Sequence, residues 1–405
     1  MLKNKMYADY KKRLDIHGTV LYPAVMIAPV QKDILEELIS GDEINSIIDP
    51  FCGSGTALYE ALEINSNLHL VGCDINPLAK LITEVKLQGV DENILEDIST
   101  LKKTIPYIEL EEIISFPNCN KWIRSDILES LSILKDAINR IESDRNRKFF
   151  WCMLCDLIRK YSNTSSSTYK LYIKDRNKEA TLENNLISDY IKKIELDYTK
   201  FFASSDNCII YKDDVNHLLP SFLDNTFDIT ITSPPYGDNR TTVPYGEFSM
   251  LNLYIIDSRD LDLEGWELGN YSVIDSRSLG GKRVKSIDIS QDDLALISPY
   301  ISQISVNKRE KVLRFFDDYF RFLKETCRIT RKYIVLTLGN RTVDRINIDL
   351  TTISMQYLET HGFKNIKATT RDIPHKRTPV ITSCIDSSPV SSINKEYVII
   401  HKKSL

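Results

Sequence analysis

The chain has 405 residues, of which 42% are hydrophobic, so it can form one large α/β domain with insertions, or two domains. Its formal net charge of −5 argues against a protein that binds nucleic acid through a generally basic surface. The last third differs, because residues 301–405 carry 19 Lys and Arg against 10 Asp and Glu. This region could contact phosphates, or it could form an ordinary solvated face.

The sequence shows no sign of secretion or membrane insertion. No apolar run approaches the roughly 18 residues that span a membrane, and the first residues lack the apolar core of a signal peptide. We therefore expect a soluble, cytoplasmic protein.

Eight cysteines in a chain of this length do not indicate a disulfide-rich scaffold. Cys152 and Cys155 form a lone CxxC, and no second pair of ligands stands at the spacing that zinc would need. We expect no metal site and interpret both residues as buried helix cysteines.

The first informative unit combines a strand, a glycine-rich loop and a helix. A short segment with Tyr22 and Pro23 precedes a helical pattern at 30–39, and an apolar strand at 47–48 follows. The strand runs into Asp49-Pro50-Phe51-Cys52-Gly53-Ser54-Gly55-Thr56 and then a helix at 57–64. Gly53 and Gly55 let a ligand approach the backbone closely. The loop is neither a phosphate loop nor a complete dinucleotide fingerprint.

The second unit ends in an acid. A strand at 68–71 leads to Asp74, which lies roughly 20 residues beyond the glycines, before a helix at 77–87. A carboxylate in this place meets ribose hydroxyls in many nucleotide sites, and the alternative is a helix cap.

Residues 91–204 interrupt this alternation of strands and helices. They show helical periodicity at 128–141, 149–161 and 186–194, with a polar loop at 162–168. We expect a helical insertion that either carries target recognition or only stiffens the structure.

The third strand, at 208–211, precedes Asp213 and Asp214 and a helix at 215–223. The fourth, at 227–231, ends in Ser233-Pro234-Pro235-Tyr236. Proline cannot continue a ladder, so this motif must follow the strand at its carboxyl end, where α/β sheets bind ligands. The Ser233 hydroxyl and the Pro234 carbonyl could accept hydrogen bonds there, and Tyr236 places an aromatic ring beside them.

The remaining chain completes the sheet. A long polar segment with Arg240 near its start reaches about residue 307, and we interpret it as a functional or mobile loop. A helix at 308–326, a strand at 333–338 and a helix at 348–358 follow. The stretches 363–369 and 396–401 indicate a closing antiparallel pair. The loop between them carries Lys376 and Arg377, for which phosphate contact and an ordinary solvated loop are both open.

The Asp-Pro-Phe-x-Gly-Ser-Gly-Thr and Ser-Pro-Pro-Tyr motifs together resemble those of the S-adenosylmethionine-dependent amino-group DNA methyltransferases of restriction–modification systems. The resemblance covers about residues 17–90 and 205–403. It implies a class I methyltransferase, with a Rossmann-like, doubly wound, mostly parallel α/β sheet of seven strands whose last strand is reversed. The catalytic domain would comprise 1–90 and 205–405, and the helical insertion 91–204.

The resemblance also assigns roles. Ser233, Pro234, Pro235 and Tyr236 would form the catalytic motif, in which Tyr236 could stack on a flipped base. The S-adenosylmethionine site would comprise Tyr22, Pro23, Asp49, Phe51, Gly53, Gly55, Thr56, Asp74 and one or both of Asp213 and Asp214. We expect Arg240, Lys376 and Arg377 to contact double-stranded DNA. A cognate restriction endonuclease could be a further partner, and the oligomeric state stays open.

The target base is the finest expectation. A serine before Pro-Pro is typical of cytosine-N4 enzymes in this family, and adenine-N6 methylation is the alternative. Methylation of cytosine carbon 5 is rejected, because it needs a cysteine nucleophile and the sequence contains no Pro-Cys pair. An RNA amino-methyltransferase and a non-catalytic cofactor-binding subunit are weaker alternatives. The resemblance implies an intracellular protein of a bacterium or phage.

Overall fold

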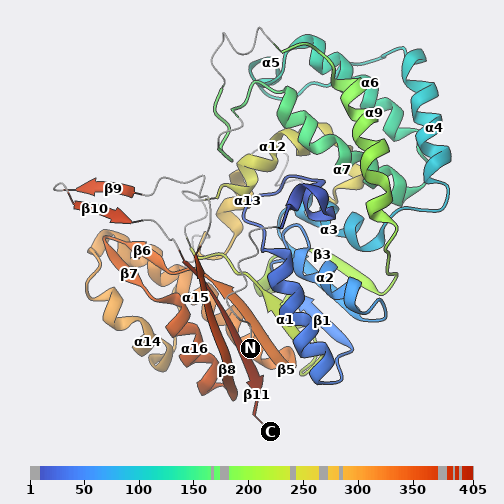
Figure 1. The fold of residues 1–405 in the computed structure, drawn as a ribbon. Coiled ribbons are helices and arrows are strands. Elements are labelled where there is room, and N and C mark those ends of the chain that lie inside the picture. Colours follow the sequence, from blue (N-terminus) through green and yellow to red (C-terminus); the bar gives the residue numbers. More distant parts are fainter. Residues whose placement is uncertain are drawn as a thin grey trace.

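A seven-stranded sheet forms the centre of the molecule in the computed structural model (Figure 1). The structure describes residues 10–165, 168–173, 182–237, 243–263, 272–281, 286–372, 381–385, 388–391 and 395–404. The strand order is β3-β2-β1-β4-β5-β11-β8; β11 is antiparallel to both β5 and β8, and the other neighbouring pairs in this sheet are parallel. The strands are β1 Ser46–Asp49, β2 His69–Asp74, β3 Cys208–Lys212, β4 Phe227–Thr232, β5 Thr330–Leu338, β8 Phe363–Asp372 and β11 Lys395–Lys403. The predicted mostly parallel sheet with one reversed strand is confirmed.

Helices cover both faces, because successive strand residues point to opposite sides. Ile47 belongs to one hydrophobic cluster and Ile48 to the other. The first cluster includes α1 Ala28–Gly41, α2 Thr56–Ile64 and α3 Pro77–Gln88, and the second includes α10 Val215–Leu218, α15 Val306–Ile329 and α16 Leu350–Thr360. The sheet is therefore doubly wound, as predicted.

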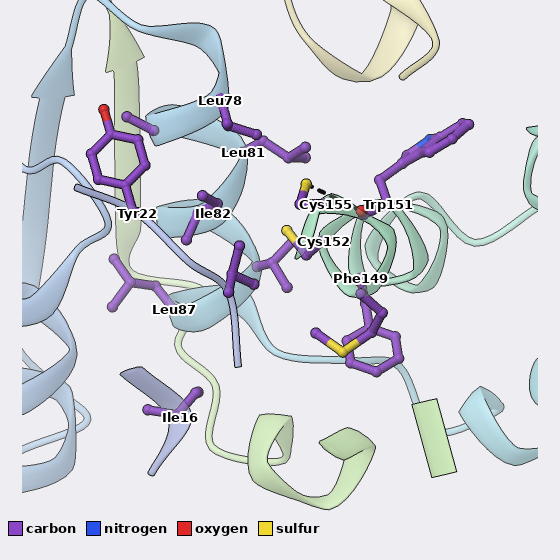
Figure 2. Close-up of a cluster of buried hydrophobic side chains, with 14 of the residues drawn as sticks. Ile16, Tyr22, Leu78, Leu81, Ile82, Leu87, Phe149, Trp151, Cys152 and Cys155 are labelled. Carbon is purple, nitrogen blue, oxygen red and sulfur yellow. Dashed lines mark hydrogen bonds between the residues drawn. The ribbon is translucent and has the colours of Figure 1, made fainter. Parts of the chain in front are cut away.

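The 91–204 segment packs on the outer side of α3. Its helices are α4 Ile94–Thr104, α5 Cys119–Trp122, α6 Ser125–Asn139, α7 Asp144–Tyr161 and α9 Leu186–Asp197. Figure 2 shows side chains of α3 and α7 in one cluster, with Cys152 and Cys155 among them. Both cysteines are buried, and the Cys155 thiol donates to the Trp151 carbonyl at 3.4 Å, so their interpretation as buried helix residues is confirmed.

Two expectations about local structure were wrong. The polar segment before residue 307 is not one loop, because it contains α12 Tyr245–Ile255, α13 Ser272–Arg277 and α14 Gln291–Ile301. Residues on nearly every side of α12 are buried, so its sequence lacks the amphipathic period that marks a surface helix. The helix expected at 215–223 ends at Leu218 and continues as a 3₁₀ turn, Leu219–Ser221, because Pro220 has no N–H to donate.

Two short hairpins lie after the carboxyl ends of the strands. One, β6 Arg341–Val343 with β7 Ile346–Ile348, follows β5, and the other, β9 Ile381–Ile385 with β10 Ser388–Ser391, lies between β8 and β11 and projects beyond the sheet (Figure 1). Tyr397 of β11 pairs with Leu338 and with Thr370, so β8 leaves the sheet at the same edge as β5.

Part of the basic surplus of the last third lies at the opposite edge. Arg331 Nε is 2.9 Å from Asp228 Oδ1, at the amino end of β4. Lys332 and Lys402 reach Asp42, just before β1, at 3.1 Å and 3.5 Å. These side chains tie the last third of the chain to earlier acids, away from the carboxyl ends. No helix within the described residues is long and apolar enough to cross a membrane.

Candidate functional site

The carboxyl ends of β1 and β4 meet through a buried carboxylate. Thr232 Oγ1, at the end of β4, donates to Asp49 Oδ1 at 2.6 Å, and the Phe51 N–H contacts the same oxygen at 3.1 Å. The Phe51 N–H is also 3.2 Å from Thr232 Oγ1. The residue before Ser233 is thus bonded directly to the start of the glycine loop.

Asp49 has one unused oxygen. Within the described residues, its buried Oδ2 atom has no hydrogen-bond partner. Burial raises the pKa of Asp49 to about 7, and the nearby charge of Asp74 adds to the shift. In its ionised form, Asp49 thus has one acceptor oxygen that the described residues leave without a hydrogen bond.

The glycine loop needs both its glycines. Gly53 and Gly55 have φ values of +51° and +71°, which L side chains rarely adopt, and a Cβ at Gly55 would lie 2.7 Å from Thr83 Cγ2. Side chains of helix α3 donate hydrogen bonds to two carbonyl groups of the loop. Thr83 Oγ1 donates to the Gly53 carbonyl at 3.0 Å, and Lys86 Nζ donates to the Ser54 carbonyl at 2.7 Å.

Lys86 is part of a buried polar chain. Its Nζ atom lies 3.4 Å from His17 Nδ1, and His17 Nε2 is 2.8 Å from Glu60 Oε1. Burial lowers the pKa of Lys86 to about 7, lowers that of His17 and raises that of Glu60 to about 7. These hydrogen-bonded side chains connect the N-terminal segment, α2, α3 and the glycine loop.

Asp74 braces the loop from the end of β2. Its carboxylate accepts from the Gly53 N–H at 2.9 Å and from the Asn76 N–H at 2.9 Å, and burial raises its pKa to about 6. The alternative role as the cap of α3 is wrong, because Asn76 is the N-cap and accepts from the Leu78 N–H at 3.1 Å.

Tyr22 lies against the glycine loop. Its ring would be 3.5 Å from a Cβ at Gly53, and its hydroxyl accepts from Asn76 Nδ2 at 3.1 Å. The ring stacks on Tyr245 with centroids 5.9 Å apart and meets Phe248 edge-on at 6.3 Å. Tyr22 and the neighbouring Pro23 are both buried.

The two acids after β3 divide their roles. Asp214 caps α10, because its carboxylate accepts from the Asn216 N–H at 3.0 Å. The Asp213 side chain is 32% exposed and lies 2.8 Å from His217 Nδ1. Lys212 pairs with Asp74 in the sheet, so Asp213 follows at the same edge. Both oxygens of Asp213 contact His217, and Oδ1 also accepts from the Asp214 N–H at 2.7 Å.

Ser233 and Tyr236 face each other in the loop after β4. Ser233 Oγ is 3.2 Å from the Tyr236 hydroxyl, which reaches the Thr337 carbonyl at 3.5 Å. Pro234 is buried, whereas Ser233, Pro235 and Tyr236 are partly exposed. The strand end therefore presents a hydroxyl and an aromatic ring together on a rigid turn.

Gly237 ends this turn with φ +82°, and a Cβ there would collide with the Arg341 guanidinium and the Phe315 ring.

The other residues predicted for the site lie farther from these contacts or outside the described residues. The Phe51 ring packs edge-on against Phe322 at 5.1 Å, and Thr56 is buried at the start of α2. Arg240, Lys376 and Arg377 lie outside the described residues.

Sequence reasoning missed Thr232, Asn76, Tyr245 and Arg341. Thr232 and Asn76 have local signals, since one is the last polar residue before Ser233 and the other stands before a helix-starting proline. Tyr245 and Arg341 approach the site only through α12 and β6, which the sequence pattern did not reveal.

The strand order, with the glycine loop and the Ser-Pro-Pro-Tyr loop bonded together at the carboxyl edge, defines the arrangement expected of a class I methyltransferase. No protein-family model matches the chain. It is 30% identical over 393 residues to the type II methyltransferase M.MvaI of Kocuria varians, a match that covers 90% of this chain and 85% of that protein. The chain therefore belongs to the type II DNA methyltransferases of restriction–modification systems.

Other matches are weaker. The type II methyltransferase M.BsoBI of Geobacillus stearothermophilus is 25% identical over 280 residues, covering 58% of this chain and 52% of that one. The solved rRNA methyltransferase AviRa of Streptomyces viridochromogenes is 10% identical, covers 99% of this chain and 94% of that one, and has a TM-score of 0.31. This last score is too low to add to the assignment.

Proposed function

We propose that this DNA methyltransferase transfers the methyl group of S-adenosylmethionine to N4 of cytosine within a specific double-stranded sequence. One observation carries the proposal. Thr232 bonds to Asp49 and lies beside Phe51, so the turn that carries Ser233 and the glycine loop share one edge of the sheet.

The polar groups at this edge fit S-adenosylmethionine, which supplies a methyl group on a positively charged sulfur. The unpartnered oxygen of Asp49 suits the ammonium group of S-adenosylmethionine. Gly53 and Gly55, with positive φ and no Cβ, let the ligand come close to the backbone of the loop. Asp74 stands where a carboxylate meets ribose hydroxyls. Asp213, partly exposed at the same edge, would accept from the adenine amine, and Tyr22 covers the loop.

Ser233 and Pro234 act on the base. The exocyclic amine of cytosine is conjugated with the ring and is a poor nucleophile. Acceptors at the Ser233 hydroxyl and the Pro234 carbonyl take hydrogen bonds from the amine, so the nitrogen becomes pyramidal and its lone pair turns toward the methyl group. Pro234 and Pro235 hold these acceptors rigidly, which is the preorganisation that electrostatic catalysis needs. Tyr236 stacks on the flipped base.

DNA lies across the carboxyl edge in this proposal. The chain leaves the sheet there after Thr232 and after Asp372, and Arg240 and the pair Lys376 and Arg377 follow these points in the sequence. These three cations contact phosphates, which positions the duplex without reading its sequence. Target recognition falls to exposed parts of 91–204 or of 257–306.

Methylome sequencing of a methylation-free host that expresses the chain tests this function. We expect N4-methylcytosine at one short sequence, and much less of it in cells that express Ser233→Ala. N6-methyladenine at that sequence would correct the base and leave the site in place. Methylated RNA with unmodified DNA would refute the proposal.

A further inference from the structure

The helices of the 91–204 segment hold the backbone that leads into Tyr22. Asp156 of α7 accepts from the Leu21 N–H at 2.7 Å, and Lys193 of α9 donates to the Thr19 carbonyl at 2.5 Å. The two side chains also face each other, with Lys193 Nζ 3.8 Å from Asp156 Oδ2. Residues far apart in the sequence thus clamp three consecutive residues before Tyr22.

This clamp acts on main-chain groups that need partners. Residues 19–21 form neither helix nor strand, so no regular ladder serves their N–H and carbonyl groups. Thr19 is 2% exposed and Tyr22 is 3% exposed. Buried main-chain groups without partners are costly, so Asp156 and Lys193 determine where this backbone can lie.

The same segment also reaches the far side of Tyr22. The Arg159 guanidinium lies 5.0 Å from the Phe248 ring centroid, and the Leu171 N–H donates to Glu247 at 2.8 Å. Phe248 and Glu247 belong to α12, whose Tyr245 stacks on Tyr22. Figure 2 shows Tyr22 together with side chains of α3 and α7.

We propose that the 91–204 segment is part of the donor-binding apparatus, in which Asp156 and Lys193 are positioning residues that hold Tyr22 over the glycine loop. This inference rests on the proposed function, because it takes S-adenosylmethionine as the ligand of that loop. It gives the segment a role beyond target recognition. Replacement of the whole segment would therefore disturb donor binding as well as any specificity.

Calorimetry with S-adenosylmethionine on full-length variants tests the inference. Asp156→Leu should weaken donor binding about 10- to 100-fold, because the partly buried Leu21 N–H loses a charged acceptor. Asp156→Asn keeps an acceptor oxygen and should bind within about threefold of the wild type. In steady-state assays, Asp156→Leu should raise the KM for S-adenosylmethionine by a larger factor than it lowers the kcat at saturating donor.

Asp189→Leu is the matched control. Asp189 joins the same two helices through Lys160 and Tyr161, both at 2.6 Å, so its loss disturbs the insertion without releasing residues 19–21. If Asp156→Leu does not fold, Lys193→Met provides the same comparison. Equal donor affinity in the Asp156 and Asp189 variants would overturn the inference. A wild-type protein that did not bind S-adenosylmethionine would overturn the proposed function as well.

Discussion

At the scale of single residues, the site contains two carboxylates, Asp49 and Asp74, whose pKa values burial raises toward 7. The pKa values of Asp49 and Asp74 rise to about 7 and about 6 because both groups are removed from water. Each is bonded to the glycine loop, so their ionisation and the shape of the loop are linked. A cationic ligand favours the ionised form of both.

Donor binding should therefore strengthen as pH rises from about 5.5 to about 7.5, because the proton on Asp49 must leave before its carboxylate can pair with an ammonium group. Calorimetry at several pH values should show proton release on binding near pH 6. Asp49→Asn should bind more weakly at pH 7.5 and show a shallower pH dependence. A wild-type affinity that did not change over this range would remove Asp49 from the donor site.

At the scale of elements, the local motifs could be predicted and their supports could not. Each strand that ends in Gly, Pro or Asp carries its own signal, so the glycine loop, Asp74 and Ser233 were located from sequence alone. The contacts of Lys86 depend on how α3 packs beneath the loop. Helix α12 is buried on nearly every side, which removes the periodicity by which a surface helix is recognised.

Helix α3 yields a prediction through Lys86. Lys86→Met should lower the affinity for S-adenosylmethionine roughly fivefold, because the Ser54 carbonyl loses the hydrogen bond from Lys86 Nζ. The pKa of Lys86 is about 7 in the folded protein and 10.5 in the unfolded chain, so the unfolded chain binds the extra proton between these values. Wild-type stability should therefore rise with pH over this interval, and the variant should lose part of that rise.

Thermal unfolding between pH 7 and 10 measures this difference. Lys80→Met is the control, because Lys80 lies on the same helix and pairs with Asp262 at 2.7 Å instead of contacting the loop. If Lys86→Met and Lys80→Met changed the slope of stability against pH equally, the buried lysine would not be its source.

At the scale of the whole molecule, charge counts predict less than topology does. The mostly parallel sheet with its reversed last strand followed from the family resemblance, and the closing antiparallel pair followed from the stretches 363–369 and 396–401. The excess of Lys and Arg in the last third did not by itself predict a DNA-binding surface, because Lys332 and Lys402 pair with Asp42 at the amino edge of the sheet. The sequence alone does not distinguish cations that form ion pairs at the amino edge, such as Lys332 and Lys402, from cations that could contact DNA.

DNA binding should reflect this division. Joint Lys376→Ala and Arg377→Ala substitution should weaken binding to all sequences alike and flatten the salt dependence by about 0.9 for each phosphate that the variant no longer neutralises. Lys402→Ala should leave the salt slope unchanged. Fluorescence anisotropy over a range of salt concentrations measures both variants. A double variant that changed which sequence is methylated would show that this loop reads bases.

The most direct test of the proposed mechanism is mass spectrometry of nucleosides from DNA incubated with the purified protein and S-adenosylmethionine that carries a deuterated methyl group. We expect deuterated N4-methylcytosine from the wild type. Ser233→Ala should produce it much more slowly, with little change in donor affinity, because the acceptor that it lacks matters only as the nitrogen becomes pyramidal. A Ser233→Ala variant that methylated cytosine at the wild-type rate would contradict the central claim, because catalysis would then not depend on the Ser-Pro-Pro-Tyr loop.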